Sequence, residues 1–391
     1  METFAASQRA QPNIAQGKLV RFLSLDVFRG MTIAGMILVN TPGSWEYVYA
    51  PLRHAPWNGC TPTDLVFPFF LFAVGNALSF SMPKYQALGT DKVLQKIFTR
   101  TLLIFLIGIF LNWFPFVRWS EGELIFKPWS TLRIFGVLQR IALAYFGAAL
   151  IVHFFKTRQV FFAALSLLIG YWLILISFGD LTLEGNAVLK LDRWLLGEDH
   201  LYKGYFSALL NQNIAFDPEG LLSTIPAVAS VIFGYLSGKY IKEKGNSYEM
   251  ISHLLVAGLL SIFVGLCWNI VFPINKPIWS SSYVFYTTGL ALSILSVIIF
   301  LVDLKGRRGW TNPFVLFGKN PLLIYALSGI LVRIYGLILI GDNNAYGALY
   351  QYIFQPLAGN FVGSLLFAIA HVLFFLAVAW FLDRKRIYLK V

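Results

Sequence analysis

The sequence predicts an all-α polytopic membrane protein, a single bundle of about 10 (10–11) transmembrane helices. Of its 391 residues, 57% are hydrophobic and only 13% are charged, whereas soluble globular domains carry roughly 25% charged residues. Apolar windows of about 20 residues, the length that crosses a hydrocarbon core, recur along the whole chain. No internal repeat or long linker separates them, so one compact bundle is expected.

Ten apolar windows mark the predicted helices. They are centred near 23–41, 64–82, 97–114, 134–154, 159–178, 221–240, 251–272, 283–303, 314–335 and 361–382. Pro and Gly interrupt several of them, which membrane helices tolerate where neighbours or cavity water satisfy the backbone. The predicted transmembrane domain therefore spans 23–382, between an N-terminal segment, 1–22, and a tail, 383–391.

The first residues do not read as a secretory signal peptide, because they are polar and the first apolar window carries Asp26 and Arg29. We expect the N-terminal segment to be retained. Cys60 and Cys267 are too few and too scattered for a disulfide framework or a Cys/His ligand cluster. We therefore expect no structural disulfide and no metal.

Basic residues predict the orientation. With the N-terminus inside, 19 of the 31 Lys and Arg residues fall on inner segments and 8 on outer ones, which favours both termini in the cytoplasm. The formal net charge of +12 is then carried by loops facing anionic membrane lipids, so no nucleic acid is needed to explain it. The longest connection, 179–220, becomes an acidic outer loop. Such loops are often functional, and the alternative is a merely solvated segment.

The first two helices and their connecting loop hold the most informative polar residues. Asp26 and Arg29 lie near the inner end of the first helix, and Asn40 and Asp64 lie near the outer ends of the pair, with His54 between them. Ionisable groups at bilayer depth are costly and are usually functional. A histidine with an ordinary pKa of about 6.5 is suited to accept a proton at neutral pH.

Asp64 and Asn40 are the two residues predicted to assist the chemistry of His54, and each has an alternative structural role. Asp64 is predicted either to orient and stabilise the imidazole, as triad carboxylates do, or to cap its helix. Asn40 is predicted to donate to a developing oxyanion, and an interhelical hydrogen bond is the alternative. The remaining histidines are expected to be packing or surface residues: His153, His200, His253 and His371.

Seven segments in order between residue 24 and about 328 resemble one known family. They are SLDVFRG, HAPWNG, TDLVFPFFLFAVG, LRIFGVLQRIALAY, FDPEGLLSTIPAV, PINKPIWSSSYVFYTTGLAL and GKNPLLIY. This ordered set resembles the transmembrane heparan-α-glucosaminide N-acetyltransferase family and its bacterial homologues. The family histidine falls on His54.

The resemblance implies an enzyme that takes the acetyl group of cytosolic acetyl-CoA to the amino group of a glucosamine unit across the membrane. It also implies a bacterial inner-membrane location and a homodimer. Family members with a large lumenal domain carry it ahead of the SLDVFRG-like segment. Only about twenty polar residues precede that segment here, so acceptor recognition by such a domain is not expected.

Candidate donor contacts follow from the phosphates of acetyl-CoA. Arg29, Lys319 and Asn320 are placed to meet a phosphate or the pantetheine amides, because an arginine fork binds phosphate well. Asp26 pairs with Arg29 on the same helical face, and this pair either replaces or supports that role. Arg140 is expected to meet the cofactor or the sugar, whereas Arg333 is expected to extend toward the interface.

A sugar site is predicted on the outer side, where aromatic faces and carboxylates would hold a pyranose. Its members are Trp57, Asn58, Asp217, Glu219, Lys276 and Trp279. For the tryptophans the alternative is the interfacial aromatic belt.

The reaction scheme and two rival functions remain open at this stage. The amine attacks the thioester directly with His54 as base, or His54 is first acetylated and then transfers the group. We favour the direct route. A membrane O-acyltransferase or a secondary transporter is the alternative function.

Overall fold

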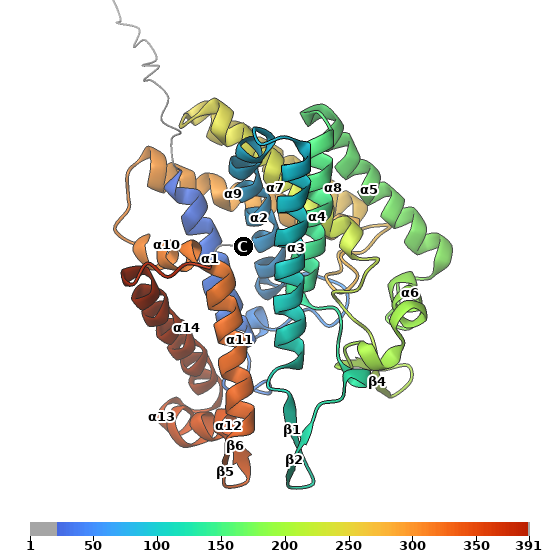
Figure 1. Ribbon diagram of the computed structural model, residues 1–391, viewed down its shortest axis with the longest axis vertical. Helices are drawn as coiled ribbons and strands as arrows, with labels where there is room; N and C mark the ends of the chain where they lie inside the picture. Colours follow the sequence, from blue (N-terminus) through green and yellow to red (C-terminus); the bar gives the residue numbers. More distant parts are fainter. Residues whose placement is uncertain (1–21, 390–391) are drawn as a thin grey trace, which may run out of the picture.

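The computed structural model describes residues 22–389, and a helix covers each of the ten predicted windows (Figure 1). The long helices are α1 (Leu23–Asn40), α2 (Pro62–Gln86), α3 (Thr90–Trp113), α4 (Val137–Phe154), α5 (Thr157–Phe178), α7 (Thr224–Lys244), α8 (Tyr248–Trp268), α9 (Ser281–Ile299), α11 (Pro321–Leu337) and α14 (Asn360–Arg384). Short helices are α6 (Ala187–Leu196), α10 (Asn312–Lys319), α12 (Ala345–Leu349) and α13 (Gln355–Ala358). The predicted N-terminal segment lies, up to residue 21, outside the described residues.

The all-α polytopic class is confirmed, and length and composition mark most of the predicted spans as membrane helices. Within residues 22–389, eight helices are long and apolar enough to cross a bilayer, and α10 with α11 forms a ninth if this pair, bent by 87°, is one span. The bend falls at Asn320, inside the window predicted as one helix. Helix α7 is long enough but falls short in apolar content, because serines, glycines and lysines interrupt its apolar residues.

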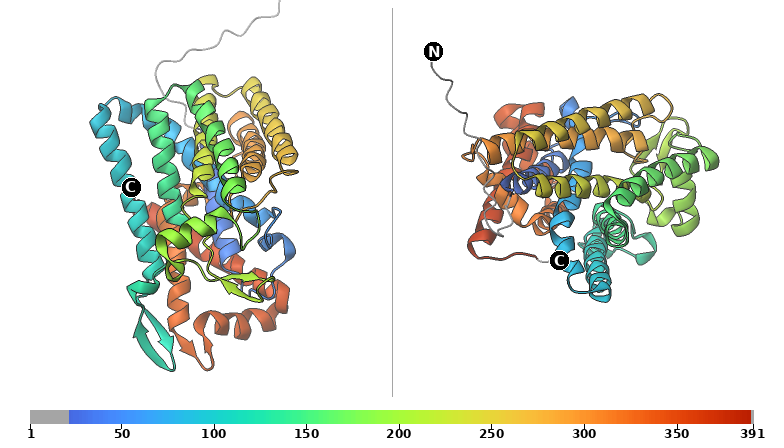
Figure 2. Two further views of the ribbon diagram at one scale, coloured as in Figure 1. Left: turned by 90° about the vertical axis from the view of Figure 1, so that its right-hand side faces the viewer. Right: turned by 90° about the horizontal axis from the view of Figure 1, so that it is seen from above.

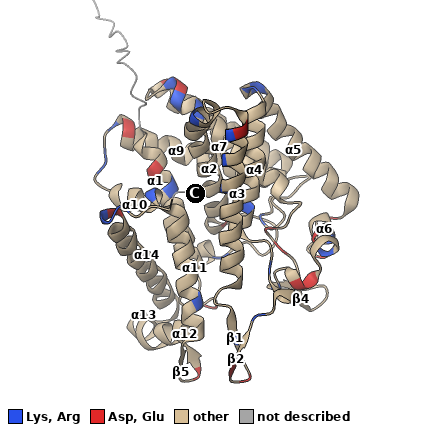
Figure 3. Ribbon diagram, in the orientation of Figure 1, with Lys and Arg blue, Asp and Glu red and all other residues tan. Residues whose placement is uncertain are grey.

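Successive long helices run in opposite directions, so the connections between them lie at the two ends of the bundle. One end carries two of the three antiparallel hairpins, β1 (Val117–Ser120) with β2 (Glu123–Phe126) and β5 (Leu339–Ile340) with β6 (Asn343–Asn344) (Figure 1). We call it the hairpin end; the loops 41–61, 179–223 and 269–280 also lie there. Most basic residues lie toward the opposite end, with the start of α1 (Figure 3).

The long connection after α5 is folded rather than open. It contains α6 and a hairpin of β3 (Tyr205–Ser207) and β4 (Gln212–Ile214). Their apolar side chains form a separate core with the C-terminal end of α5 and the α8–α9 loop, including Val188, Phe216 and Ile278. Periodicity predicted only an acidic loop here, because a ten-residue amphipathic helix is too short for a membrane window.

Glycines let the central helices approach closely. A Cβ on Gly75 of α2 would lie 2.0 Å from the Val231 carbonyl oxygen of α7, and one on Gly234 would lie 2.1 Å from the Phe72 carbonyl oxygen. Small residues commonly provide such contacts in membranes, where van der Waals packing replaces the hydrophobic driving force. Helices α2 and α7 therefore form the centre of the bundle, and α5 and α8 lie at its periphery (Figure 2).

Candidate functional site

The loop between α1 and α2 places His54 at the start of α2. Arg53 fixes the loop by donating hydrogen bonds to the carbonyl oxygens of Val48 (2.7 Å) and Glu46 (2.9 Å). Pro62 occupies the first turn of α2, where its missing N–H costs nothing. Thr61 and Asp64 form a reciprocal capping box. These contacts hold the residues on both sides of His54.

The two carboxylate oxygens of Asp64 serve different partners. Oδ2 accepts hydrogen bonds from the Ala55 and Thr61 backbone N–H groups, both at 3.0 Å, and Oδ1 lies 2.6 Å from His54 Nδ1. Asp64 is buried at 1% exposure, whereas the His54 side chain is 47% exposed. Asp64 therefore caps α2 through Oδ2 and contacts the His54 imidazole through Oδ1, so both interpretations describe its geometry.

Lys276 approaches the same pair from the α8–α9 loop. Its Nζ lies 3.0 Å from His54 Nδ1 and 3.4 Å from Asp64 Oδ1. The loop is held against the His54 loop because the Gly59 N–H donates to the Ile274 carbonyl oxygen at 2.7 Å. Burial lowers the pKa of Lys276 from its ordinary value, and the carboxylates of Asp64 and Glu219 oppose this shift.

These distances favour one tautomer of His54. Nδ1 cannot both donate to Asp64 and accept from Lys276, and the 2.6 Å contact with Asp64 is the shorter. With the proton on Nδ1, Lys276 donates to Asp64 Oδ1 instead, and Nε2 keeps its lone pair. The arrangement can accept a proton at Nε2 while Asp64 supports the resulting imidazolium.

A cavity of about 120 Å³ adjoins His54 and is lined by residues from seven parts of the chain: α1, α2, α4, α11 and the loops that hold His54, Glu219 and Lys276. Asn40 from α1, Glu219 from the connection between α6 and α7, and Lys276 lie around it with His54. Among residues 22–389 the Asn40 side chain has no hydrogen-bond partner. The predicted interhelical hydrogen bond is therefore not formed, and the amide is available to a bound group.

Glu219 and Asp217 are held by an arginine that sequence reasoning did not select. Arg133 donates to both oxygens of Asp217, at 2.8 and 2.7 Å, and to Glu219 Oε2 at 2.6 Å. Burial alone would lower the pKa of Arg133, but the hydrogen bonds and charges of the two carboxylates raise it. Asp217 accepts these two hydrogen bonds from Arg133 and a third from the Glu219 N–H. Only Glu219 also reaches the cavity beside His54.

The predicted tryptophans occupy different environments. Trp57 is partly buried, donates to the Leu181 carbonyl oxygen at 2.9 Å and packs edge-to-face with Phe216. Neighbouring Asn58 accepts from Asn275 Nδ2 at 3.1 Å. Trp279 is 1% exposed, and its Nε1 donates to Ser230 Oγ at 3.2 Å. The structure thus puts Trp279 in the core, away from the surface where sugar stacking was predicted.

Arg140 lies under the site without lining the cavity. It is fully buried, with its guanidinium 5.0 Å from the centre of the Trp279 ring. Its Nη2 donates to Ser223 Oγ and, at 3.2 Å, to the Gly220 carbonyl oxygen. Arg140 therefore contacts the chain immediately after Glu219.

The remaining predicted donor contacts gather where α1 meets α10 and α11, toward the other end of α1. Arg29 donates to the Gly318 carbonyl oxygen at 3.1 Å and lies 3.6 Å from Asp26. Lys319 pairs with Asp383 at 2.8 Å, and Asn320 Nδ2 donates to the Ile387 carbonyl oxygen at 3.0 Å. Lys319 and Asn320 thus bind the C-terminal segment in this structure.

Other reactive groups do not join the His54 site. Burial, with a further contribution from Asp64, raises the pKa of Cys60 to about 12, which makes it a poor nucleophile at neutral pH. Both cysteines are unpaired. Across residues 22–389, no group of three His, Cys, Asp or Glu side chains is arranged to hold a metal ion. His153, His200, His253 and His371 do not line the cavity.

Two functional candidates escaped the sequence analysis. Arg133 is the second residue of the LRIF segment, and its carboxylate partners lie more than eighty positions away, so no local pattern could connect them. Arg333 was expected to extend to the interface, but it lines a second cavity next to the first. The sequence signal for a functional Arg333 was the presence of a basic residue inside an apolar window.

A polytopic membrane bundle with a histidine–carboxylate pair beside a cavity defines a membrane-embedded protein equipped for acid–base chemistry. Over residues 21–264 the chain matches the family described as heparan-alpha-glucosaminide N-acetyltransferase, catalytic, and it belongs to that family, as the sequence motifs predicted.

Two proteins named heparan-alpha-glucosaminide N-acetyltransferase are similar to it. The Homo sapiens protein is 32% identical over 356 residues, covering 78% of this chain and 52% of the relative. The Mus musculus protein is 32% identical over 366 residues, covering 81% and 54%. The chain therefore spans about half the length of these curated relatives.

Proposed function

We propose that this protein transfers an acetyl group from cytosolic acetyl-CoA to the amino group of a glucosamine-type sugar on the extracytoplasmic side, with His54 as the general base. The observation that carries the proposal is the 2.6 Å contact between His54 Nδ1 and buried Asp64, beside a cavity. The names of the relatives supply the acceptor class. The setting would be a bacterial inner membrane with both termini cytoplasmic, which the uneven distribution of basic residues supports.

The chemistry requires an uncharged amine next to a thioester. The amine nitrogen attacks the thioester carbonyl carbon, and His54 Nε2 accepts a proton from that nitrogen as the bond forms. The carbonyl oxygen becomes negative, and the unpaired Asn40 amide donates to it. The C–S bond then breaks, CoA leaves as a thiolate that takes up the proton, and the acetyl group remains as an amide on the sugar. We propose this direct route rather than an acetyl-histidine intermediate, because one cavity then serves both substrates.

The acceptor would bind at the hairpin end. Glu219 reaches the cavity while Arg133 fixes its carboxylate, so it is suited to hold a sugar hydroxyl or the incoming ammonium. Lys276, Trp57, Asn58 and Asp217 would shape this side, and Trp279 would act from the core through its contact with Arg140. Free amino sugar or a glycan fragment is the proposed acceptor class.

The donor would enter from the opposite side. Asp26 and Arg29 on α1 lie close to Lys319 and Asn320 at the α10–α11 bend. We propose that these four residues meet the phosphates or pantetheine of acetyl-CoA, since an arginine fork and helix-terminal amides suit phosphate. Arg140 would act indirectly by fixing the Gly220 carbonyl. Membrane lipids and a second copy of the chain are further proposed partners.

The test is an assay of purified protein with acetyl-CoA and glucosamine, measuring CoA release and N-acetylglucosamine. His54→Ala is expected to abolish transfer while the protein remains folded, because His54 is half exposed and contributes little packing. His253→Ala, a histidine far from the cavity that contacts Tyr240, is the matched control and should retain activity. Transfer by His54→Ala within a few-fold of the parent would remove His54 from the base role. Solute flux without either product would favour a transporter, and acetylated His54 recovered after acetyl-CoA alone would contradict the direct route.

A further inference from the structure

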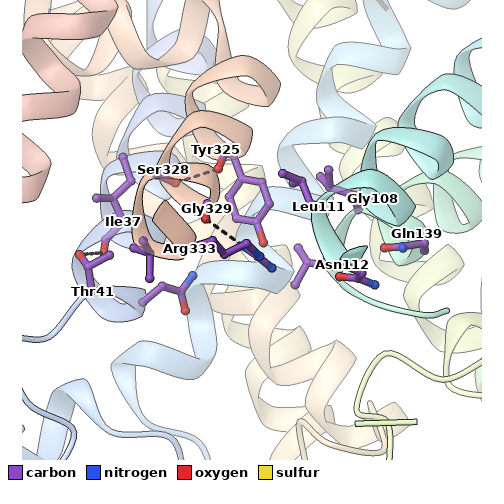
Figure 4. Close-up of a pocket in the computed structure, with 14 residues that line it drawn as sticks. Ile37, Thr41, Gly108, Leu111, Asn112, Gln139, Tyr325, Ser328, Gly329 and Arg333 are labelled. Atoms are coloured by element: carbon purple, nitrogen blue, oxygen red, sulfur yellow. Dashed lines mark hydrogen bonds between the residues drawn. The ribbon is translucent and has the colours of Figure 1, made fainter. Parts of the chain in front are cut away.

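A second and larger cavity lies next to the His54 cavity at the junction of α1, α3, α4 and α11. Its volume is about 240 Å³, and it shares Asn40, Val137 and Tyr325 with the first. Figure 4 shows the Tyr325 ring and Arg333 from α11 reaching toward the same space, with Asn112 and Gln139 facing them from α3 and α4. A ligand in this cavity would therefore lie directly beside a group reacting at His54.

The cavity is built around an amide that has no partner. Gln139 is 1% exposed, lines the cavity, and its Nε2 donates to no described atom. The backbone makes room for it: a Cβ on Gly108 would lie 2.5 Å from Gln139 Oε1, and one on Gly136 would lie 3.0 Å from it. Leaving a buried N–H donor unsatisfied costs about 1–3 kcal/mol. A bound acceptor atom would remove that cost.

Arg333 supplies a positive charge without an acidic partner. Its Nη1 donates only to the Gly329 carbonyl oxygen, at 2.9 Å, and among residues 22–389 it forms no ion pair. Most of the guanidinium fork, five N–H donors in all, is thus left for a ligand.

The surroundings of Arg333 add further positive charge. Burial lowers the pKa of Lys127, and the charges of Arg333 and Arg118 lower it further. The β1–β2 hairpin that carries Arg118 is tied to the end of α11, because Trp119 Nε1 donates to the Leu337 carbonyl oxygen at 3.0 Å. Neither Arg118 nor Lys127 pairs with a described carboxylate. A cluster of unneutralised cations beside a cavity is stabilised by an anion.

We infer that the cavity at Arg333 and Gln139 binds an oxyanion, a phosphate, sulfate or carboxylate group, carried by one of the two substrates of the His54 site. Arg333 provides the charge-assisted hydrogen bonds and Gln139 Nε2 an additional donor. The substrate assignment rests on the proposed function. Because the donor is proposed to meet Arg29 and Lys319 with its phosphates or pantetheine, at the other end of α1, the oxyanion is assigned to an acidic substituent on the acceptor sugar.

Binding measurements without turnover separate these sources. Affinities of the purified protein are measured for two matched pairs: CoA against pantetheine, which lacks its phosphates, and glucosamine 6-phosphate against glucosamine. Arg333→Gln is compared with the parent and with Arg158→Gln, an arginine near the start of α5 that packs over the Phe162 ring. Gln139→Leu removes the second donor, and Arg333→Lys restores the charge without the fork.

Arg333→Gln is expected to weaken the anionic member of one pair by about 10- to 100-fold, the loss typical of a charged hydrogen bond. The affinity of Arg333→Gln for the neutral member, and the affinities of the Arg158→Gln control, should change less than twofold. Gln139→Leu should weaken binding of the anionic member less than Arg333→Gln does, and Arg333→Lys should have an intermediate effect. A response of the glucosamine 6-phosphate pair supports the assignment to the acceptor, and a response of the CoA pair alone would overturn it. Equal weakening of both members, or no preference for an anion in the parent, would overturn the inference. These results stand whether or not acetyl transfer is observed.

Discussion

Replacing Asp64 with asparagine separates helix capping from histidine chemistry. The new side chain would keep one oxygen to accept from the Ala55 and Thr61 N–H groups, as Asp64 Oδ2 does. Its amide nitrogen would then face His54 Nδ1 and donate to it. The imidazole would be forced into the tautomer with its proton on Nε2, which cannot accept a proton from the acceptor amine.

The size of the effect follows from the exposure of the ring. A positioned base contributes about 10²–10⁴-fold to rate, and the same carboxylate-to-amide change costs about 10⁴ in serine proteases. The His54 side chain is 47% exposed, so water can compete for the ring and the wrong tautomer is held less rigidly. We therefore expect Asp64→Asn to lower kcat about 10²–10³-fold, or about 3–4 kcal/mol in the barrier.

The assay measures kcat for CoA release per folded molecule, with the folded fraction taken from size-exclusion chromatography. Thr61→Ala is the matched control, because it removes the capping hydroxyl and leaves the 2.6 Å contact between His54 and Asp64. It should lower stability by about 1 kcal/mol while kcat stays within threefold. An Asp64→Asn protein whose kcat is also within threefold of the parent would refute the tautomer argument.

Two further predictions concern stability. Burial raises the pKa of Asp192 from 3.8 to about 7, so the contribution of this carboxyl to stability is full below about pH 4 and is lost as pH rises through 7. Between pH 5 and 8 the melting temperature should therefore fall more steeply for the parent than for Asp192→Asn. Equal slopes for the two proteins would contradict this. Gly234→Ala should destabilise the protein by about 1–3 kcal/mol through overpacking against Phe72. The control Gly170→Ala, with open space around its Cβ position, should not destabilise it, and similar melting temperatures for both variants would show that the α2–α7 approach is unimportant.

Local patterns predicted the helices and the core of the candidate site. Apolar windows located all ten helical segments, because bilayer thickness imposes a length that composition reveals. His54, Asp64 and Asn40 were found because polar groups at helix ends are conspicuous in an apolar chain. The structure adds that Lys276, predicted as a sugar contact, lies 3.0 Å from His54.

Tertiary contacts account for what the sequence could not predict. Arg133 and Glu219 meet across 86 positions, and neither carries a periodic signal. Lys319 and Asn320 were predicted as donor contacts from their position and polar side chains, without their partners Asp383 and Ile387 in the C-terminal segment. Trp279 was predicted as a sugar contact, with an interfacial position as the alternative, but the fold buries it against Arg140.

The weak apolar character of α7 bears on how the chain enters the membrane. His54 precedes α7 in the sequence and Lys276 follows α8, and because α8 is apolar enough to cross, their contact requires α7 to cross as well. If α7 did not insert into the membrane, every later segment would have the opposite orientation, and Lys276 would lie on the other side of the membrane from His54. Polar residues of α7 such as Ser230 and Ser237 are buried inside the bundle, where Gly75 of α2 lets the two helices approach closely. Insertion of α7 should thus depend on helices already integrated, and assembly of the site would report correct topogenesis.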